Sequence, residues 1–341
     1  MTTPARHQSD TARADPVPAV LNEGLELSDV RAAHRRIEKH LAATALRAYP
    51  ALAELIGTEV WVKHENHLPT GAFKVRGGVN LVAQLGEDDR ARGLTSASTG
   101  NHGQSIAYAA RLHGVRATVC VPEGANPLKV AAIRALGAEV AVFGRDFDDA
   151  RGYCERLAQE RGFRYVHSGN EPHLIAGVAT ATLELLEQEP EIDVIIVPVG
   201  GGSGAAGACI TAKAIRPAIE VIGAQSEAAP AAYRSWREGR LCEDRMETFA
   251  EGLATRVGFE LPQRILRRHL DHFVLVGDDE IRAATLHMIG GTGNLVEPAG
   301  ASPLAAALKL RERLSGKKVA LVCSGGNINL DQLRELLATA S

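Results

Sequence analysis

The chain has 341 residues, of which 45% are hydrophobic and 23% charged, and its formal net charge is −3. This composition is ordinary for a globular protein long enough to form two lobes, and the slight acidic excess argues against nucleic-acid binding. The five cysteines form no paired-cysteine motif, and no apolar stretch approaches the length of a membrane span. We therefore expect a cytoplasmic protein with reduced thiols and with neither a nucleic acid nor a membrane as partner.

Residues 1–18 are polar and contain prolines, and they lack the apolar centre of a secretory signal, so we expect a loose N-terminal arm. Beyond them, short β-branched runs alternate with alanine-rich amphipathic stretches. The clearest example is a strand at 117–122, a helix at 127–136 and a second strand at 139–143. Such alternation predicts βαβ units on a mostly parallel sheet, and therefore the α/β class.

Lys74 is the most informative residue of the first third of the chain. It lies between Phe73 and Val75 and follows the turn residues Thr70 and Gly71. This position predicts a helix start and a partly desolvated ammonium, and such a lysine can act as a nucleophile. Taken alone, a surface lysine packing over apolar neighbours is the simpler interpretation. Three further segments favour the reactive one.

The first of these segments follows a predicted strand at 93–97 and concentrates hydroxyl, amide and imidazole groups at a strand-to-helix turn. Its residues are Ser98, Thr99, Gly100, Asn101 and His102. The pattern predicts a polar cradle for a ligand. His102 is equally well interpreted as a structural histidine that holds the turn.

Glycines follow a buried strand predicted at 194–199, directly before an alanine-rich helix. They form the run Gly200, Gly201, Gly202, Ser203, Gly204. Backbone N–H groups at such a turn can approach an anion closely, so we expect a phosphate seat. A further strand at 319–323 ends in a Ser-Gly-Gly-Asn run at 324–327, and the hydroxyl of Ser324 would face the same end of the sheet. Only a short predicted helix at 330–337 follows, so we expect no C-terminal regulatory domain.

In this order, the segments resemble the fold type II family of pyridoxal 5′-phosphate (PLP) enzymes, which is tryptophan synthase β-like, and within it the serine/threonine dehydratases, also called threonine ammonia-lyases. The resemblance runs from about Glu23 to Leu337. It implies two three-layer α/β/α lobes with mostly parallel sheets. Residues 19–92 and 169–341 would form a large PLP-binding domain, and residues 93–168 a small domain that closes over the substrate. It also implies a homodimer or homotetramer.

The resemblance assigns roles to individual residues. Lys74 would form the Schiff base, and Phe73 would belong to the cofactor pocket. Asn101 would hydrogen-bond the 3′-oxygen of PLP, and Ser324 would face its pyridine nitrogen. Glu297, in the run from Val296 to Ala301, would have a supporting role near the cofactor. The substrate carboxylate would meet Ser98, Thr99, Gly100 and His102, and the phosphate would meet residues 200–204. Ser203 and Gly204 depart from the common pattern, which has a glycine and a leucine there.

A neutral hydroxyl at Ser324 cannot hold the pyridine nitrogen protonated, which weakens the electron sink and favours prompt β-elimination. The resemblance therefore implies dehydration of a 3-hydroxy amino acid such as L-threonine or L-serine, giving a 2-oxo acid and ammonia, with the Lys74 amine as general base. Residues 223–231 and 290–294 resemble a subgroup that includes dehydratases of hydroxyectoine breakdown and of bulkier substrates such as phenylserine. Those substrates stay open as alternatives.

Two other interpretations were weighed. Gly202, Gly204 and Gly207 satisfy a dinucleotide-binding fingerprint, with Glu227 about 20 residues beyond, which makes an NAD-dependent oxidoreductase a remote alternative. A lone fingerprint does not account for Lys74, however. The carboxylates expected for the serine racemase cation site are missing from residues 225–231, with Glu227 as the only exception, so we expect no metal. Thr99 replaces the second acid/base serine of that racemase, which disfavours efficient racemisation.

Overall fold

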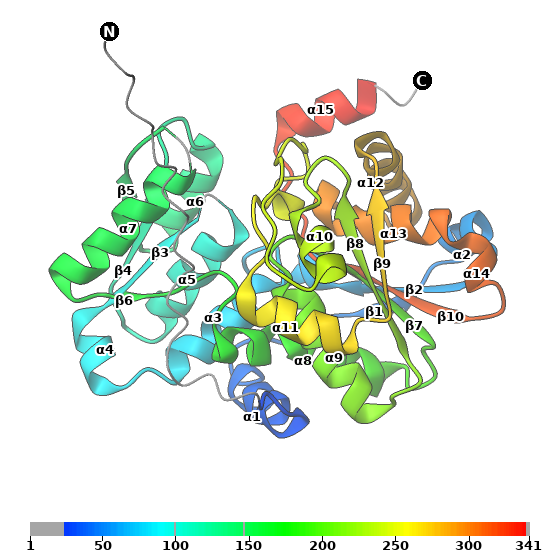
Figure 1. Ribbon diagram of the computed structural model, residues 1–341, viewed down its shortest axis with the longest axis horizontal. Helices are drawn as coiled ribbons and strands as arrows, with labels where there is room; N and C mark the ends of the chain where they lie inside the picture. Colours follow the sequence, from blue (N-terminus) through cyan, green and yellow to red (C-terminus); the bar gives the residue numbers. More distant parts are fainter. Residues whose placement is uncertain (1–23, 99, 146, 339–341) are drawn as a thin grey trace, which may run out of the picture.

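A computed structural model describes residues 24–98, 100–145 and 147–338. The predicted N-terminal arm, residues 1–18, and Thr99 lie outside these ranges. The described chain forms two α/β bodies side by side, each built around its own sheet (Figure 1). None of the described helices is both long and apolar enough to cross a membrane.

The larger sheet has six strands in the order β1-β2-β10-β7-β8-β9, and only the β1–β2 pairing is antiparallel. Parallel strands must be joined by crossovers, and helices supply them on both faces. The strands are β1 (Leu46–Ala48), β2 (Glu59–His64), β7 (Val194–Pro198), β8 (Glu220–Ser226), β9 (His272–Val276) and β10 (Lys318–Cys323).

The smaller sheet has four strands in the order β5-β4-β3-β6, and all of its pairings are parallel. It is built from a continuous part of the chain, whereas the larger sheet takes strands from both sides of that part. The strands are β3 (Leu94–Ala97), β4 (Ala117–Val121), β5 (Glu139–Val142) and β6 (Arg164–Tyr165).

Helices cover both faces of each sheet. In the larger body, α2, α12 and α13 pack on one face, and α8, α9, α10 and α11 lie on the other. The helices before β3 are α1 (Leu27–Ile37), α2 (Pro50–Ile56), α3 (Lys74–Ala83) and α4 (Glu87–Arg92), with the 3₁₀ turn η1 (Glu65–His67). Between β3 and α8 lie α5 (Asn101–Leu112), α6 (Pro127–Ala135) and α7 (Phe147–Arg161). The remaining helices are α8 (Pro172–Gln188), α9 (Ser203–Ile215), α10 (Ala231–Glu238), α11 (Glu260–His269), α12 (Asp278–Thr292), α13 (Pro298–Lys309), α14 (Arg311–Leu314) and α15 (Leu330–Ala338), with η2 (Glu251–Leu253).

These layers confirm the predicted α/β class with mostly parallel sheets. The predicted strand–helix–strand unit is confirmed as β4, α6 and β5, with boundaries that differ by one residue. The buried strands expected before the glycine run and before Ser324 are β7 and β10, and a helix does begin at Lys74.

Close backbone packing holds α8 between α3 and α9. A Cβ atom on Gly177 would lie 2.6 Å from the Arg76 carbonyl oxygen, and one on Gly207 would lie 2.9 Å from the Ala179 nitrogen. Both distances are shorter than a side chain tolerates, so small residues are required at the two crossings. The starts of α3 and α9 are thereby fixed relative to each other.

A buried group of charged side chains joins α3 to η1, α8 and β2. The Arg76 guanidinium donates to both carboxylate oxygens of Glu65 at 2.6 and 2.9 Å, and to both of Glu184 at 2.7 Å. Lys63 also donates to Glu184, at 3.0 Å. None of these four side chains is more than 5% exposed. Bidentate pairing therefore compensates charges that have lost their water.

Candidate active site

Four helices begin close together where the two bodies meet. They are α3, α5, α9 and α13. Lys74, Asn101 and Ser203 are the first residues of α3, α5 and α9, and Glu297 is the N-cap of α13. None of the four has a side-chain cap hydrogen bond, so first-turn N–H groups of α5, α9 and α13 are left for other acceptors. In α3, the N–H groups of Val75 and Arg76 donate to the Ala72 and Phe73 carbonyls. Four positive helix ends and uncapped N–H groups favour an anionic ligand.

Lys74 lies at the centre of this convergence. Its Nζ donates to the Ser203 hydroxyl at 2.8 Å and to the Ser168 carbonyl at 2.9 Å. It also lies 5.3 Å from the centre of the Phe73 ring. Burial lowers the pKa of Lys74 from 10.5 to about 8, and no carboxylate of the described residues pairs with it to oppose that shift. A sizeable fraction of the amine is therefore neutral near physiological pH, as a nucleophile or general base requires.

The glycine run forms a loop between β7 and α9. Gly202 adopts a left-handed conformation, with φ of 92°, which turns the chain into the helix. Side chains at Gly200 and Gly201 would collide with the Gly252 carbonyl and the Phe259 ring. At Gly204, a Cβ would lie 3.1 Å from the Phe73 ring, so the loop and Phe73 are neighbours. The N–H groups of Gly200, Gly201 and Gly202 donate no hydrogen bond to another described residue, so they remain available to a ligand.

Asn101, Glu297 and Asn327 form a hydrogen-bonded row beside the loop. The Asn101 amide donates to Glu297 Oε1 at 2.8 Å, and its carbonyl accepts from the Asn327 amide at 2.7 Å. Burial raises the pKa of Glu297 to about 7, although the nearby Lys129 charge and the Asn101 amide oppose the shift. Glu297 can therefore hold or release a proton near neutral pH.

Ser324 follows β10 and lies against the segment that carries Lys74. Its carbonyl accepts from the Phe73 backbone N–H at 2.9 Å, and it is 5% exposed. An isolated bridge between Ala72 and Gly325 continues this contact. The strand end and the lysine turn, which are about 250 residues apart in sequence, are thus held together by backbone hydrogen bonds.

The predicted substrate turn lies at the start of α5. Ser98 is 8% exposed, and its hydroxyl accepts from the Gly100 N–H at 3.2 Å. His102 is buried, and its Nε2 lies 3.5 Å from the Val166 carbonyl. Burial, and next the Lys74 charge, lower the pKa of His102 to about 3, so its imidazole is neutral. Its Nδ1 has no hydrogen-bond partner among the described residues.

Comparisons with known proteins give the family. Residues 37–325 match the family described as pyridoxal-phosphate dependent enzyme. The chain belongs to this family. It is 37% identical over 316 residues to an L-threonine ammonia-lyase of Thermotoga maritima, covering 92% of this chain and 78% of that protein. It is 33% identical over 311 residues to an L-threo-3-hydroxyaspartate ammonia-lyase of Saccharomyces cerevisiae, covering 91% and 95%. A serine racemase structure from Dictyostelium discoideum superposes with a TM-score of 0.84, at 36% identity, covering 89% and 99%.

The chain is therefore a PLP-dependent enzyme of fold type II, as the resemblance implied. The geometry fits the cofactor. PLP needs an amine for its aldehyde, and Lys74 supplies one. Its phosphate needs N–H donors, and those of Gly200, Gly201 and Gly202 donate no hydrogen bond to another described residue.

Three features of the site were not assigned from the sequence. Asn327 is the last residue of the Ser-Gly-Gly-Asn run that follows β10, and its position in that run is the signal that could have found it. Ser168 acts through its backbone carbonyl, which no side-chain pattern reveals. The ion pair between Lys129 of α6 and Glu251 of η2 joins the two bodies beside Glu297, and it depends on tertiary contact alone.

The residues of the dinucleotide fingerprint do follow a strand, β7, and begin a helix, α9. Their contacts, however, are made within the protein and around Lys74. Ser203, inside it, accepts from Lys74, and Gly207 packs on Ala179 of α8. Family membership therefore overturns the NAD alternative. In the segment compared with the racemase cation site, residues 225–231, Gln225 Oε1 accepts from the Tyr233 N–H at 2.9 Å. In the described part of the chain, no group of three or more His, Cys, Asp or Glu side chains could hold a metal ion.

Proposed function

We propose that this enzyme is a PLP-dependent dehydratase that eliminates water from a 3-hydroxy amino acid, with L-threonine or L-serine as substrate, and yields a 2-oxo acid and ammonia. The observation that carries the proposal is the Lys74 amine, held at the meeting point of four uncapped helix ends with a pKa lowered to about 8. Relatives named as ammonia-lyases of threonine and of hydroxyaspartate support the reaction class.

Lys74 has two tasks in this proposal. Its Nζ would hold the cofactor covalently, and as a free amine the same nitrogen would take the proton from the substrate α-carbon. PLP, when bound, withdraws electrons from that carbon and so acidifies its proton. Burial lowers its pKa and so raises the fraction of neutral amine, and the Ser203 hydroxyl and Ser168 carbonyl hold it in place.

The residues around Lys74 would hold and tune the cofactor. The N–H groups of residues 200–204 and the Ser203 hydroxyl would bind its phosphate, and Phe73 would border the ring. Asn101 would donate to the ring oxygen, and Ser324 would face the pyridine nitrogen with a neutral hydroxyl. Glu297, in contact with Asn101, would exchange a proton close to this oxygen.

The start of α5 would receive the substrate. Ser98 and Gly100 lie at its uncapped N-terminus, where backbone N–H groups and the helix dipole favour a carboxylate. Thr99 is assigned to the same turn from the sequence. His102 is neutral and buried, so we assign it to support of the turn and not to proton transfer.

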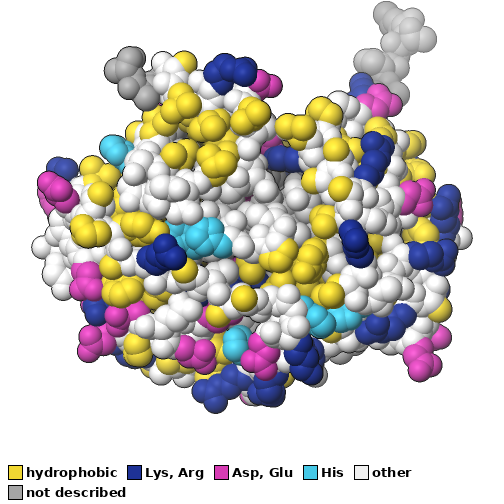
Figure 2. Space-filling model, turned by 180° about the vertical axis from the view of Figure 1, so that it is seen from behind, with side chains coloured by type: hydrophobic (Ala, Val, Ile, Leu, Met, Phe, Trp, Pro, Cys, Tyr) yellow, Lys and Arg dark blue, Asp and Glu magenta, His cyan; other side chains and the backbone are white. Residues whose placement is uncertain are grey.

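The proposal includes a homodimer or homotetramer in the cytoplasm. Hydrophobic side chains gather over α15 at the upper left of Figure 2, where Leu330 and Leu337 are 72% and 57% exposed. An apolar patch on the surface favours burial against a second copy. All five cysteines are free, which supports a reducing compartment. Sedimentation of the purified protein tests the assembly.

The first experiment is a visible absorption spectrum of the purified protein, followed by assays for 2-oxo acid and ammonia. L-threonine, L-serine, L-threo-3-hydroxyaspartate and L-threo-phenylserine are compared at equal concentration. We expect a cofactor band that borohydride fixes, and activity that is fastest on threonine or serine. Lys74→Ala should lose both, whereas Lys39→Ala, at an exposed lysine, should keep both. A protein that holds PLP and converts none of the four substrates would contradict the proposal. Fastest turnover of phenylserine would move the substrate to the bulkier alternative.

A further inference from the structure

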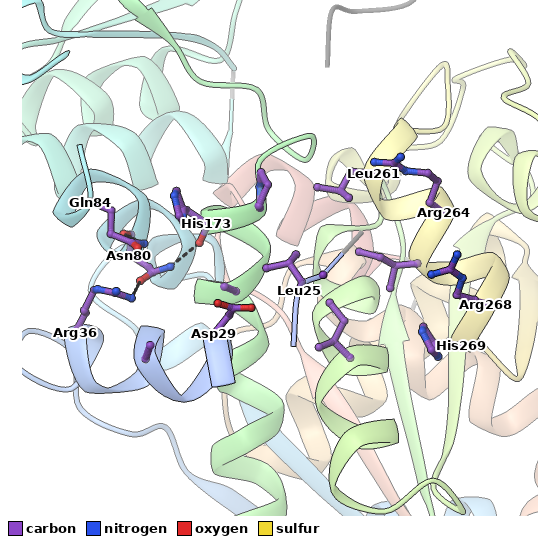
Figure 3. Close-up of a pocket in the computed structure, with 16 residues that line it drawn as sticks. Leu25, Asp29, Arg36, Asn80, Gln84, His173, Leu261, Arg264, Arg268 and His269 are labelled. Carbon is purple, nitrogen blue, oxygen red and sulfur yellow. Dashed lines mark hydrogen bonds between the residues drawn. The ribbon is translucent and has the colours of Figure 1, made fainter. Parts of the chain in front are cut away.

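A second cavity of about 270 Å³ lies between α1, α8 and α11 (Figure 3). Its volume is near the lower end of small-molecule pockets, roughly 300–1,000 Å³. None of the residues of the candidate active site lines it, so it is a separate cavity. Its walls bring together the first helix of the described chain and helices that begin more than 140 residues later.

Basic side chains form two opposite walls of this cavity. Arg264, Arg268 and His269 follow one another along α11, and Arg36 of α1 lies on the other side with Asn80 (Figure 3). The lining has three arginines and one aspartate, a local charge of 3 − 1 = +2, in a chain whose net charge is −3. The aspartate, Asp29, is engaged at the start of α1, where it accepts from the Glu26 N–H at 2.9 Å. The cavity therefore favours an anion.

One of these arginines is available for a ligand. No hydrogen bond or ion pair joins the Arg264 guanidinium to another described residue, and the residue is only partly exposed. Across the cavity, Arg36 donates to Asn80 Oδ1 at 3.3 Å, and Asn80 donates to the His173 carbonyl at 2.7 Å (Figure 3). A guanidinium with free donors at the edge of an apolar space binds a carboxylate well.

Apolar side chains form much of the remaining lining, together with Gln84 and His173. Leu25, Ile210, Leu261 and Ile265 are its larger aliphatic side chains, and Leu25 lies between the two basic walls (Figure 3). A fully hydrated inorganic anion would gain nothing from these side chains. A ligand with one carboxylate and a short aliphatic chain would use both the arginine and the apolar surface.

Two helices connect the cavity with the site around Lys74. Lys74 donates to the carbonyl of Ser168, four residues before α8. Asn170, two residues after Ser168, accepts at Oδ1 from the Leu261 N–H of α11 at 3.1 Å. Phe259, the N-cap of α11, packs its ring against Gly201 of the glycine loop. A ligand that shifts α8 against α11 would therefore change the surroundings of Lys74 and of the loop.

We propose that this cavity is a second ligand site, for a small amphipathic carboxylate, and that its occupancy changes the environment of the bound cofactor. The carboxylate pairs with Arg264, and the aliphatic chain packs on Leu261 and Ile265. The site is regulatory, because no group in it can attack or deprotonate an amino acid bound at Lys74.

Hexanoate is the test ligand, and the full-length chain loaded with PLP is the protein. Binding is measured by titration calorimetry, and coupling by the visible absorption of bound PLP. Hexanamide has the same shape without the charge, and acetate has the charge without the chain. Arg264→Gln removes the cation, and Ala32→Phe fills the cavity from α1. Arg35→Gln, at an exposed arginine of α1 outside the lining, is the matched control.

We expect hexanoate to bind the wild type and Arg35→Gln with equal affinity and to change the cofactor spectrum in both. Arg264→Gln and Ala32→Phe should each weaken binding by about tenfold or more, and hexanamide and acetate should bind about tenfold more weakly than hexanoate. Equal affinity in all four proteins, no binding to the wild type, or binding without a spectral change would overturn the proposal. Neither readout requires turnover, so a failure of the proposed dehydration would be seen separately.

Discussion

Asn327 donates its side-chain amide to the carbonyl oxygen of Asn101 at 2.7 Å and to the Thr70 carbonyl at 2.8 Å. With its oxygen occupied in this way, Asn101 must direct its own amide toward Glu297, 2.8 Å away. The orientation of an asparagine follows from its hydrogen-bond partners. Asn327 is therefore a positioning residue, which decides whether Asn101 presents a donor or an acceptor to the cofactor site.

The first prediction concerns that contact. Asn327→Ala should lower kcat by about tenfold and shift the absorption of bound PLP, because Asn101 can then rotate. Asn329→Ala is the control, since Asn329 lies in the same loop but caps α15 through the Gln332 N–H. Steady-state kinetics and spectra of both variants check the prediction. If the two variants behave alike, the effect comes from the loop as a whole and not from Asn101.

The second prediction is a pH dependence of cofactor capture. Only the neutral amine of Lys74 attacks the PLP aldehyde, and burial lowers its pKa to about 8. The rate of PLP incorporation into the cofactor-free chain should therefore rise about tenfold per pH unit below 8 and level off above it. Stopped-flow absorption between pH 6 and 10 measures it. A rise that continues beyond pH 10, as for an exposed lysine, would show that the amine is solvated.

The third prediction concerns Glu297, whose pKa burial raises from 4.5 to about 7. The folded chain then binds a proton that the unfolded chain releases between these values, so stability falls as pH rises from 4.5 through 7. This loss of folding free energy is at most about 3 kcal/mol, because one unit of pKa corresponds to about 1.36 kcal/mol. Glu297→Gln keeps an acceptor for Asn101 and should lack this loss. Denaturant unfolding of the cofactor-free wild type and Glu297→Gln at pH 5.5 and 8 measures how the free energy of unfolding of each changes with pH. Equal pH slopes would mean that Glu297 is ionised throughout.

The fourth prediction concerns the buried charges below α3. Arg76→Met leaves two carboxylates, Glu65 and Glu184, buried with Lys63 as the remaining cation, and should lower the free energy of unfolding by about 3–5 kcal/mol. Arg76→Lys should recover only part of this, because an ammonium lacks the planar fork with which the guanidinium makes two bidentate pairs. Arg92 is half-exposed and pairs with Asp89, so Arg92→Ala should change the free energy of unfolding by less than about 1 kcal/mol. Urea unfolding of the three variants ranks them, and a small effect of Arg76→Met would show that water reaches the network.

Local pattern determined much of the fold and several parts of the site. β-branched runs bounded by turn residues predict strands wherever they occur, which is why β4, β5, β7 and β10 were located within one residue. The lysine turn, the glycine run and the Ser-Gly-Gly-Asn run combine chemistry and turn formation in a few consecutive residues. The sequence also indicated that each follows or precedes a strand, so their approach at one edge of a parallel sheet could be inferred.

Only the tertiary structure decided how those residues contact one another and what lies outside the motifs. The Ser168 carbonyl on Lys74, the Asn327 amide on Asn101 and the Lys129–Glu251 pair each join segments at least 90 residues apart. Backbone acceptors and long-range pairs leave no local pattern, because their partners are chosen by the packing of helices and not by neighbours in the chain. The lowered pKa of Lys74 has the same origin, since burial is a property of the assembled cleft. The sequence by itself determined which groups the site contains, and packing decided their protonation and their orientation.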